Sequence, residues 1–502
     1  MTLLDGLTAW LADILRRMLS LLPAEQPAYL AGGAVRDLMR GRAPRDVDLA
    51  LHGNVLHTAR RLADAVGAAY YPLDVERETA RLVLQQPGQP RLVVDLAALR
   101  GADIQADLRA RDFTVNAMAI DLRQPETLID PLGGIKDLHD RWLRVCSPTA
   151  LLDDPVRTVR AVRQAFGLEI KILPETAALI RQAVPQLPRI SIERVRDELF
   201  HILESSQVAP AVRALDMFGA LPYILPELPG LKGITQSPPH TQDVWEHTLA
   251  VAGRLQIVLG VLGPAYDADS GNLAVGLASL RLGRYRERII QHLETPFTPE
   301  RSDRALLALA ALYHDIAKPA TRSVDAEGRV RFFEHDQLGE QIIYERALAL
   351  RLSRDEIERL KLIVRHHMRP MLLAQAGELP SRRAIYRFYR QVGAAGVDIC
   401  LLSLADFLGT YGAALPQDEW SRHLDVIRAL LEAWWETPEQ VVAPPRLVDG
   451  RQLIARFGLS PGPQIGRLLE SIQEAQATGE VTTPEQAFEL AAKLLEENHP
   501  HG

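Results

Sequence analysis

Hydrophobic and polar positions in the first part of the chain predict a small domain of mixed helices and strands. Residues 1–23 carry charges within an apolar run and have the pattern of an amphipathic helix. Short apolar stretches of strand length follow, and one of them is expected to fold as a hairpin around Pro87-Gly88. We therefore predict an α+β head with a small mixed sheet over residues 1–150. Its strand segments are 29–31, 46–51, 80–96 and 115–121.

The rest of the chain has the pattern of a long all-helical body. After about residue 150 the strand signals largely disappear, and apolar residues recur at helical spacing. Proline-rich segments near 222–239 and 441–445 interrupt this pattern. The stretch 260–303, which contains GPAYDADSGN and TPFTPE, is expected to be an insertion or mobile excursion between helices. The expected regions are a neck at 151–230, a middle region at 231–420 and a C-terminal helical region at 421–502.

Composition is ordinary for a globular protein of several domains. The 502 residues are too many for one core, and 47% are hydrophobic while 24% are charged. With only Cys146 and Cys400, the sequence excludes a disulfide framework and a cysteine zinc site. Charges within residues 1–23 argue against a signal peptide or a membrane span. We expect a cytoplasmic protein with no membrane partner, and its net charge of −7 still permits a local basic groove.

Two acids one residue apart, Asp46 and Asp48, begin one of the predicted strands. Successive side chains of a strand point to opposite faces, so both carboxylates share one face while Val47, Leu49 and Leu51 share the other. Neighbouring carboxylates need a shared proton, basic partners or a divalent cation, and Mg²⁺ suits carboxylate oxygens well. A solvated strand edge is the alternative, and it is the commoner explanation of an isolated Asp-x-Asp.

A glycine pair, Gly32-Gly33, lies between a predicted strand and a predicted helix just before the two acids. Free backbone N–H groups at such a helix start can bind phosphate, and the missing β-carbons let it approach. Arg36 could add a charged contact. A phosphate-binding turn beside paired acids is the arrangement that phosphoryl or nucleotidyl transfer requires. Asp95, at the end of the next apolar strand, is either a third catalytic carboxylate or an ordinary strand-terminal acid.

Five motifs follow one another in order between about residues 28 and 203. They are Gly32-Gly33-x-Val35-Arg36-Asp37 with Asp46-x-Asp48, Arg111-Asp112-Phe113-Thr114-Val115-Asn116-Ala117-Met118-Ala119, Asp130-Pro131-Leu132-Gly133-Gly134, Asp153-Asp154-Pro155-Val156-Arg157-Thr158-Val159-Arg160-Ala161-Val162-Arg163, and Ser191-Ile192-Glu193-Arg194-Val195. In this order they resemble the class II (bacterial-type) tRNA nucleotidyltransferase and poly(A) polymerase family. The resemblance implies a polymerase-β-like nucleotidyltransferase head that acts on tRNA with CTP and ATP.

The resemblance also implies roles for individual residues. Asp46 and Asp48 would hold Mg²⁺, while the glycine pair and Arg36 would hold the triphosphate. Asp154 and Arg157 would present an acceptor and a donor to the base, so that protein rather than nucleic acid serves as template. Such polar matching discriminates strongly because a wrong base leaves buried groups unpaired. The expected catalytic acids are Asp46, Asp48 and Asp95, and the expected nucleotide-binding residues are Gly32, Gly33, Arg36, Arg111, Asp112, Asn116, Asp154, Arg157, Arg160 and Arg163.

Departures from the family pattern leave the added nucleotides open. Asp153-Asp154 stands where the family usually has Glu-Asp. The segment from Asp95 to Arg111 is short, whereas complete CCA-adding members generally carry a longer loop there and CC-adding members tend to lack it. A partial enzyme that adds only CC or only A is therefore an alternative. A poly(A) polymerase fits less well, because Gly41-Arg42-Ala43-Pro44 replaces the Gly-Arg-Arg-Phe expected of one.

The predicted helical body carries a second group of candidate metal ligands. The adjacent pair His314-Asp315, with a His upstream and an Asp downstream, resembles the H…HD…D signature of HD-domain metal phosphohydrolases. Mixed imidazole and carboxylate ligands suit a divalent metal, whose identity the sequence leaves open. A single His on such a helix is more often a core or surface residue. The expected ligands are His247, His314, Asp315 and Asp406, with His335 and His366 for a second metal.

Three functions are compatible with these patterns. The favoured one is a template-independent nucleotidyltransferase that builds or repairs the 3′ CCA end of tRNA, with an HD domain that removes phosphate from damaged RNA ends. A phosphohydrolase whose head only docks substrate is the second, and a non-enzymatic RNA-binding adaptor is the third. Intact paired acids argue against both alternatives, since a pure binder does not need them.

Overall fold

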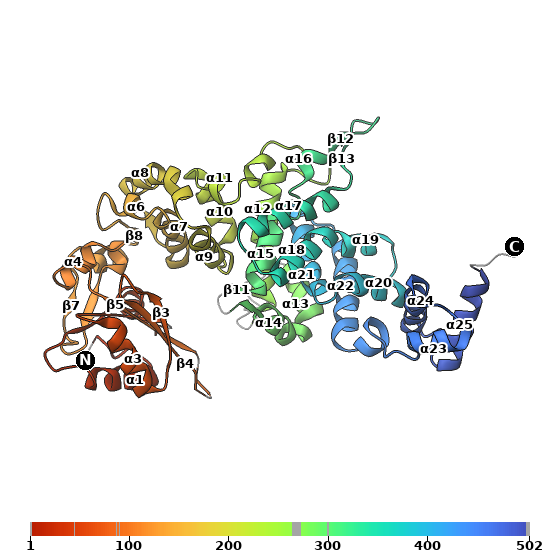
Figure 1. Cartoon of the computed structure of the whole chain (residues 1–502). Helices are drawn as coiled ribbons and strands as arrows, with labels where there is room; N and C mark the ends of the chain where they lie inside the picture. The colour runs from red at the N-terminus through yellow and green to blue at the C-terminus, as the bar shows by residue number, and fades with distance from the viewer. Residues whose placement is uncertain are drawn as a thin grey trace. The chain divides into compact units, whose positions relative to one another are not determined.

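The computed structural model describes residues 3–44, 46–86, 88–89, 91–263, 273–298 and 301–497. They form two compact units (Figure 1), each of which has its own interior. Unit 1 comprises Met1–Glu198 with Met217–Ala220, and unit 2 comprises Leu199–Asp216 with Leu221–Gly502. The predicted class, an α+β head with a mixed sheet and a helical body, is confirmed.

Unit 1 is built on a seven-stranded sheet in the order β3-β4-β5-β2-β1-β6-β7. Strands β2 and β5 are parallel, and every other neighbouring pair is antiparallel. The predicted hairpin is formed by β4 and β5, and Pro87 lies outside the described residues. The strands are β1 (Ala28–Ala31), β2 (Asp46–Leu51), β3 (Ala69–Asp74), β4 (Thr79–Leu84), β5 (Leu92–Ala98), β6 (Ala119–Asp121) and β7 (Leu128–Ile129).

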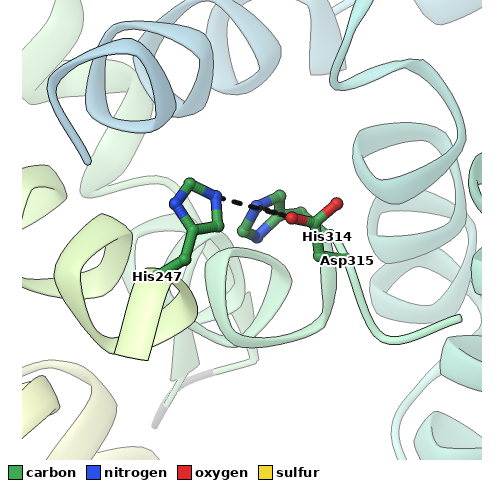
Figure 2. A group of neighbouring side chains, drawn as sticks. All are labelled: His247, His314 and Asp315. Carbon is green, nitrogen blue, oxygen red and sulfur yellow. Dashed lines mark ion pairs between the residues drawn. The ribbon is translucent and has the colours of Figure 1, made fainter. Parts of the chain in front are cut away.

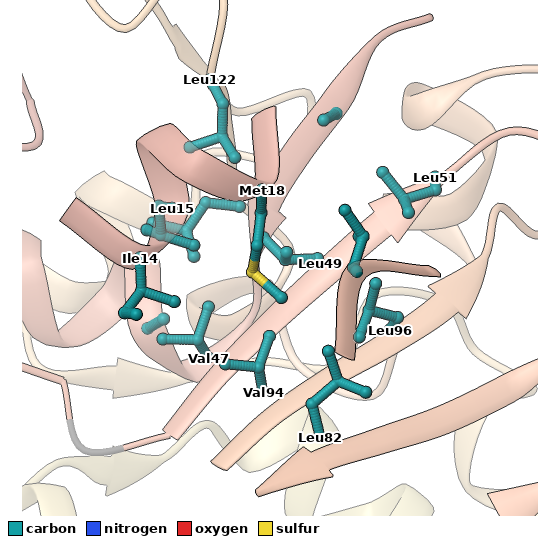
Figure 3. Close-up of a cluster of buried hydrophobic side chains, with 14 of the residues drawn as sticks. Ile14, Leu15, Met18, Val47, Leu49, Leu51, Leu82, Val94, Leu96 and Leu122 are labelled. Atoms are coloured by element: carbon teal, nitrogen blue, oxygen red, sulfur yellow. The ribbon is translucent and has the colours of Figure 1, made fainter. Parts of the chain in front are cut away.

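Two helices cover one face of this sheet and bury its apolar side chains. The amphipathic helix predicted in residues 1–23 is α1 (Ala9–Ser20), and α3 (Val55–Val66) lies beside it. Figure 3 shows Val47, Leu49 and Leu51 of β2 in the same cluster as Ile14, Leu15 and Met18 of α1. Because side chains alternate along a strand, Asp46 and Asp48 point to the other face and stay exposed. This face holds the candidate site.

Short helices and turns shape the face that carries the acids. They are α2 (Gly33–Met39), α4 (Ile104–Arg109), the 3₁₀ turn η1 (Thr114–Asn116) and α5 (Gly134–His139). Gly134 allows α5 to touch η1, because a β-carbon there would stand 2.1 Å from the Thr114 carbonyl oxygen. Asp130 accepts hydrogen bonds from the N–H groups of Gly134 and Ile135 at 2.7 and 2.9 Å. The motif that begins at Asp130 therefore holds the backbone at the start of α5 in place.

The neck consists of helices that follow the sheet. They are α6 (Ala150–Asp153), α7 (Arg157–Leu168), α8 (Pro174–Ala183), the 3₁₀ segment η2 (Val184–Arg189) and α9 (Ile192–Leu203). Two short parallel strands, β8 (Trp142–Leu143) and β9 (Lys171–Ile172), tie α7 back to the end of the head. The predicted basic helix is α7, which starts at Arg157.

Unit 2 is a helical assembly around one central helix, α21 (Ala395–Tyr411). Its segment Ala395–Ala414 is long and apolar enough to cross a membrane by length and composition, but most of it is buried inside the protein. Such burial is typical of the core helix of a globular unit. The helices around it include α10 (Val208–Met217), α11 (Leu221–Ile224), α12 (Val244–Val261), α15 (Asp303–Tyr313), α16 (Lys318–Thr321), α17 (His335–Ala349), α18 (Arg354–His366), α19 (Arg369–Gln375), α20 (Arg382–Val392) and α22 (Gln417–Trp435).

The expected excursion at 260–303 contains ordered helices over its described part. These are α13 (Leu273–Leu282) and α14 (Arg286–Leu293), which bury Leu282 and Ile289, and Tyr285 is buried in the 3₁₀ turn between them. The short strands β10 (Pro296–Thr298) and β11 (Arg301–Ser302) follow. Residues 264–272 and 299–300 lie outside the described residues.

The last helices form a separate small core. They are α23 (Gly450–Phe457), α24 (Pro463–Thr478) and α25 (Pro484–Glu497), and their cluster includes Leu453, Ile472 and Ala487. In the predicted region 421–502, this core begins only near Val448, because α22 packs against α13 and α19 in the main body.

Candidate functional site

The paired acids lie on β2, next to a third carboxylate on β5. In the parallel register Asp48 pairs with Asp95, so the predicted third acid is a direct neighbour. Arg81 of β4 donates two hydrogen bonds to the Asp95 carboxylate, at 2.8 and 3.0 Å. Asp95 is therefore already neutralised by an arginine, unlike Asp48, for which the described residues provide no hydrogen-bond partner. The structure brings the three predicted acids together but gives Asp95 a different environment.

Gly32 stands directly against the acids. It has a φ of +73°, and a β-carbon there would lie 2.8 Å from Nη1 of Arg111 and 2.9 Å from Oδ2 of Asp48. A glycine is required both by this close approach and by the left-handed backbone. The strand-to-helix turn, the acid pair and the Arg111 guanidinium thus meet at one point. This small cradle suits a triphosphate with its cation.

Electrostatics at Asp48 favour a bound cation. Its side chain reaches solvent, yet the surrounding protein desolvates the carboxylate and raises its pKa to about 6. The neighbouring Asp95 and Asp46 also raise the pKa, against the lowering effect of Arg111. A bound divalent metal stabilises the ionised form of a carboxylate that lies close to other carboxylates. The donor set therefore fits a divalent metal.

Behind the cradle, a buried polar network holds the second motif in place. Arg36 donates to Oδ1 of Asn116 at 2.8 Å, and Asn116 donates to Oδ1 of Asp112 at 3.0 Å. Asp112 also accepts from Arg160 at 3.2 Å. Burial opposes ionisation of Asp112, but Arg160 and the hydrogen bonds from Asn116 and the Phe113 N–H lower its pKa below the ordinary value. Asp112 is thus held as a charged acceptor near the nucleotide site.

The two predicted base readers lie at the start of α7 and keep unused polar atoms. Asp154 accepts a 2.7 Å hydrogen bond from Arg194 at Oδ2, while its buried Oδ1 has no hydrogen-bond partner in the described parts of the chain. Arg157 binds the carbonyls of Ala150 and Arg111, and its buried Nε likewise makes no hydrogen bond there. One free acceptor beside one free donor is what a base edge needs. Arg194, in the fifth motif, was not among the predicted site residues.

The other two arginines of α7 are anchored. Both donate to the buried Glu198 of α9 at 2.6 Å, Arg160 to Oε1 and Arg163 to Oε2. Burial disfavours the charge of Arg160, but Glu198 and Asp112 raise its pKa above the ordinary value. Arg160 and Arg163, which were expected to bind the nucleotide, are part of an internal ion-pair network that fixes α7, and Glu198 is its centre. Its role could not be inferred from the sequence alone.

In unit 2 the predicted ligands converge from three helical regions. Nε2 of His247 on α12 lies 3.4 Å from Oδ2 of Asp315 and 3.2 Å from Oδ1 of Asp406 on α21. Nε2 of His314 lies 3.1 Å from Oδ2 of Asp315 and 4.0 Å from Oδ1 of Asp406. Figure 2 shows the imidazoles of His247 and His314 close to the Asp315 carboxylate, with an ion pair marked between His247 and Asp315. Three of these residues form a group whose ligand atoms could hold one metal.

A second candidate group shares Asp315 but uses a histidine other than the predicted one. Nε2 of His335 lies 3.4 Å, and that of His367 4.0 Å, from Oδ1 of Asp315. His366, the expected ligand, is not in the group; it is the last residue of α18, and its neighbour His367 turns inward after the helix ends. The structure therefore replaces His366 with His367. His247 and His314 lie at Oδ2 of Asp315, and His335 and His367 lie at Oδ1. Asp315 would therefore be shared if both groups held a metal.

Backbone carbonyls orient three of these imidazoles. The Nδ1 atoms of His314, His335 and His367 lie 2.8, 2.8 and 2.7 Å from the carbonyl oxygens of Ala311, Phe332 and Val364. An Nδ1–H donor leaves Nε2 with a lone pair, as metal ligands require. The Nε2 atoms of His247, His314 and His335 are buried with no hydrogen-bond partner among the residues described. This chemistry fits bound divalent metal.

Two further residues border this cluster. Lys318 lies 2.6 Å from Oδ2 of Asp315, and together with His314 it lowers the pKa of this carboxyl well below the ordinary value despite burial. The ring of His240 stands 4.7 Å from that of His247. His240 directly follows the proline-rich segment 222–239, and it was not among the predicted ligands. Its place beside the site depends on the loop path, which the sequence does not specify.

A third histidine and acid group lies elsewhere in unit 2. His292 Nε2 contacts Asp398 at 2.9 Å and Asp303 at 3.0 Å. Arg359 contacts the same two acids at 2.6 and 3.5 Å. The arginine already neutralises part of the negative charge, so this group forms an ion-pair network within the core.

Family models match three parts of the chain. The Poly A polymerase head domain matches residues 28–144, a probable RNA and SrmB-binding site of polymerase A matches 169–231, and the HD domain matches 244–406. These matches cover the sheet with the paired acids, the neck and the histidine cluster.

Curated relatives extend over nearly the whole chain. An A-adding tRNA nucleotidyltransferase of Deinococcus radiodurans is 33% identical over 96% of this chain and 99% of its own length. A CC-adding tRNA nucleotidyltransferase of Thermus thermophilus is 31% identical over 92% of both chains. Among solved structures, a CCA-adding enzyme in complex with ATP has a TM-score of 0.59 at 22% identity and covers 98% of each chain.

Fold and site together define a metal-dependent nucleotidyltransferase head joined to a helical unit with an HD domain. The chain belongs to the bacterial-type tRNA nucleotidyltransferase and poly(A) polymerase family.

Proposed function

We propose that the protein is a template-independent tRNA nucleotidyltransferase that builds or repairs the 3′ CCA end from CTP and ATP. The observation that carries this proposal is the meeting of Asp48 with Gly32 and Arg111, on the same exposed face of β2 as Asp46. Bound Mg²⁺ would supply charge neutralisation of the triphosphate and a lower pKa of the RNA 3′ hydroxyl. The related enzymes act on tRNA by their names, which supports the substrate.

The residues of the head supply binding and alignment in this proposal. Asp46 and Asp48 would hold the metal, and Gly32, Gly33 and Arg36 would cradle the phosphates. Asp112, kept ionised by Arg160, offers an acceptor for the ribose. Holding the nucleotide and the RNA end in one geometry provides most of the rate gain in phosphoryl transfer.

Base selection would rest on Asp154 and Arg157. The free Oδ1 and Nε atoms match one donor and one acceptor of a base edge, and Arg194 fixes the carboxylate that reads it. A base with the reverse pattern would leave both buried groups unpaired, which costs about 1–3 kcal/mol for each.

A CC-adding enzyme is the second candidate, and one observation favours it. Residues 99–103 alone connect β5 to α4, so the longer loop expected of complete CCA enzymes is replaced by a five-residue turn. The Thermus relative is CC-adding, whereas the Deinococcus relative is A-adding, so the relatives support either kind of partial enzyme.

The decisive experiment uses purified protein, Mg²⁺ and tRNA transcripts that end before CCA, after C and after CC. CTP and ATP are supplied separately and together, and the products are sequenced. Ordered addition of C, C and A supports a complete enzyme. A stop after CC, or addition of A only to the CC-ended RNA, identifies a partial enzyme. No addition to any transcript contradicts the nucleotidyltransferase proposal.

We also propose that the HD domain is a metal-dependent phosphohydrolase for RNA ends that carry a 2′,3′-cyclic or terminal phosphate. The buried Nε2 atoms without hydrogen bonds around Asp315 support this activity. Release of phosphate or opening of the cyclic ester is measured with Mg²⁺, Mn²⁺, Co²⁺ and Ni²⁺. No turnover with any of them, or an unchanged rate for His314→Ala, would contradict it.

Substrate recognition and location complete the proposal. The tRNA body would be bound through shape and backbone by basic residues of the helical body. A cytoplasmic location is consistent with the burial of the apolar helix α21.

A further inference from the structure

A small hairpin next to the HD cluster has no role in the functions proposed so far. It consists of β12 (Arg322–Val324) and β13 (Val330–Phe332), paired antiparallel with Arg322 opposite Phe332 and Val324 opposite Val330. Figure 1 shows the hairpin projecting away from the neighbouring helices of unit 2. A two-stranded hairpin gains little stability by itself, so its base must be held by the rest of the unit.

The base of the hairpin is tied to the metal-binding cluster. The carbonyl oxygen of Phe332 lies 2.8 Å from Nδ1 of His335, whose Nε2 faces Asp315. Nζ of Lys318 lies 5.3 Å from the centre of the Phe332 ring and 2.6 Å from Oδ2 of Asp315. On its other side, the Val330 N–H donates to Oγ of Ser237 at 2.7 Å. The base of the hairpin is thus in direct contact with His335 and Lys318, both of which lie next to Asp315.

The exposed side chains of the hairpin combine apolar rings with positive charge. Phe333 is 73% exposed and Val324 is 54% exposed. Arg322 is also exposed, and the described residues offer it no ion pair. Exposing so large an aromatic side chain contributes nothing to the core of unit 2. Phe333 follows Phe332, the register partner of Arg322, so an exposed aromatic residue and an exposed arginine lie near each other along the backbone at the base of the hairpin. Exposed aromatic and arginine side chains can bind single-stranded nucleic acid by stacking and phosphate contact.

Charges of both signs lie along the hairpin. Among the acids, Asp325 lies in the turn, where Arg331 pairs with it at 3.0 Å and the Arg329 N–H donates to it at 2.8 Å. Glu327 lies in the same turn, away from the base. Glu334 follows Phe333 directly and is the N-cap residue of α17. Arg322 lies opposite Phe332 in the hairpin, and Lys318 contacts both the Phe332 ring and Asp315.

We propose that this hairpin binds the single-stranded 3′ end of RNA and presents its terminal phosphate to the HD cluster. Phe333 stacks on a base near the end, and Arg322 contacts a backbone phosphate. The inference rests on the proposed phosphohydrolase function and extends it, because it assigns a polynucleotide rather than a mononucleotide as the preferred substrate. A protein partner or a membrane would not need the close link to the metal ligands.

The test compares two substrates of the same chemistry in the full-length protein. One is a short single-stranded oligoribonucleotide with a 2′,3′-cyclic phosphate end, and the other is the mononucleotide 2′,3′-cyclic AMP. Phe333→Ala and Arg322→Ala are measured on both, with Phe333→Trp as the conservative variant. The matched controls are Leu280→Ala, whose side chain on α13 is 78% exposed, and the exposed Arg422→Ala on α22.

For Phe333→Ala we expect the KM for the oligoribonucleotide to rise about tenfold, the scale of one lost base stack. The ratio of oligonucleotide to mononucleotide kcat/KM should fall by the same factor, and Phe333→Trp should restore it. An unchanged ratio in both hairpin variants, or an equal fall in the two controls, would overturn the proposal.

If the phosphohydrolase proposal is wrong, the unaltered protein turns over neither substrate, and this outcome is distinct from a failure of the hairpin proposal. Binding of the fluorescent oligoribonucleotide, read by anisotropy, then still tests the hairpin. Weaker binding by Phe333→Ala than by Leu280→Ala supports an RNA-binding hairpin without hydrolysis. Equal binding by the two variants contradicts it.

Discussion

Asp48 and Asp95 pair in neighbouring parallel strands, but among the described residues only Asp95 accepts hydrogen bonds from an arginine. Arg81 holds Asp95 with two hydrogen bonds at 2.8 and 3.0 Å. Asp48 has a pKa raised to about 6, first by desolvation and then by Asp95 and Asp46, although Arg111 lowers it. One acid of the pair is therefore satisfied within the sheet, and the other is left for a cation.

We expect Asp48→Asn to remove activity while leaving the fold intact. The rate of nucleotide addition should fall at least about a hundredfold, the scale for one electrostatic catalytic group. Because the pKa of folded Asp48 lies above its ordinary value of 3.8, the ionised carboxylate lowers stability as pH rises through this interval. Without metal, the variant should therefore melt above the unaltered protein at pH 8 and much closer to it at pH 4.

Thermal melting and a primer-extension assay on CC-ended tRNA measure both outcomes. Arg81→Gln serves as the comparison, because it removes the partner of Asp95 and should lower the melting temperature. Retained activity in Asp48→Asn would show that another carboxylate holds the metal.

Gly32 and Gly41 provide a matched pair for testing the phosphate cradle. Both have positive φ, +73° and +69°, so alanine strains each backbone. Only at Gly32 would the new β-carbon meet Arg111 and Asp48, since nothing lies within 4 Å of the corresponding position at Gly41. We expect Gly32→Ala to abolish addition and Gly41→Ala to retain most of it.

Chemical denaturation of both variants separates stability from function. Similar losses of unfolding free energy with unequal activity support the cradle. Equal activity in the two variants would mean that the triphosphate does not approach Gly32.

His366 and His367 are adjacent, and the structure distinguishes their roles. His367 Nδ1 is held by the Val364 carbonyl, and its Nε2 faces Asp315. We expect His367→Ala to weaken binding of the second metal at least about tenfold. His366→Ala should leave metal binding nearly unchanged. Calorimetric titration with Mn²⁺ or Co²⁺ gives the stoichiometry and affinity of each variant, and a loss in His366→Ala alone would contradict the assignment.

The periodicity of the sequence was sufficient to predict which residues form the head site. It was not sufficient to predict which side chains contact them. Alternation along 46–51 placed both acids on one face, because strand geometry is local. The choice between His366 and His367 depends on where α18 ends and how the chain turns, which spacing alone does not specify. Glu198 anchors Arg160 and Arg163 from 35 or more residues away. Such partners arise from tertiary packing, so the sequence alone assigned both arginines to the nucleotide.

The pH dependence of stability should be controlled in part by His292. Burial alone would lower its pKa, but Asp398 and Asp303 raise it from 6.5 to about 10. A raised histidine pKa contributes stability that is complete below pH 6.5 and is lost as pH rises toward 10. Relative to His292→Asn, the unaltered protein should therefore have an advantage on the order of a few kcal/mol at pH 6 that shrinks by pH 10.

The groups around His292 make this prediction specific. Arg359 stays charged over the whole range, so it continues to neutralise Asp398 at 2.6 Å after the imidazole loses its proton. Asp303 retains only the longer 3.5 Å contact to Arg359, and its raised pKa shows that it is the less compensated acid. Deprotonation of His292 should thus destabilise the contact with Asp303 first. Urea unfolding at pH 6, 8 and 10, with the exposed His201→Asn as control, measures the effect, and a constant difference across this range would contradict it.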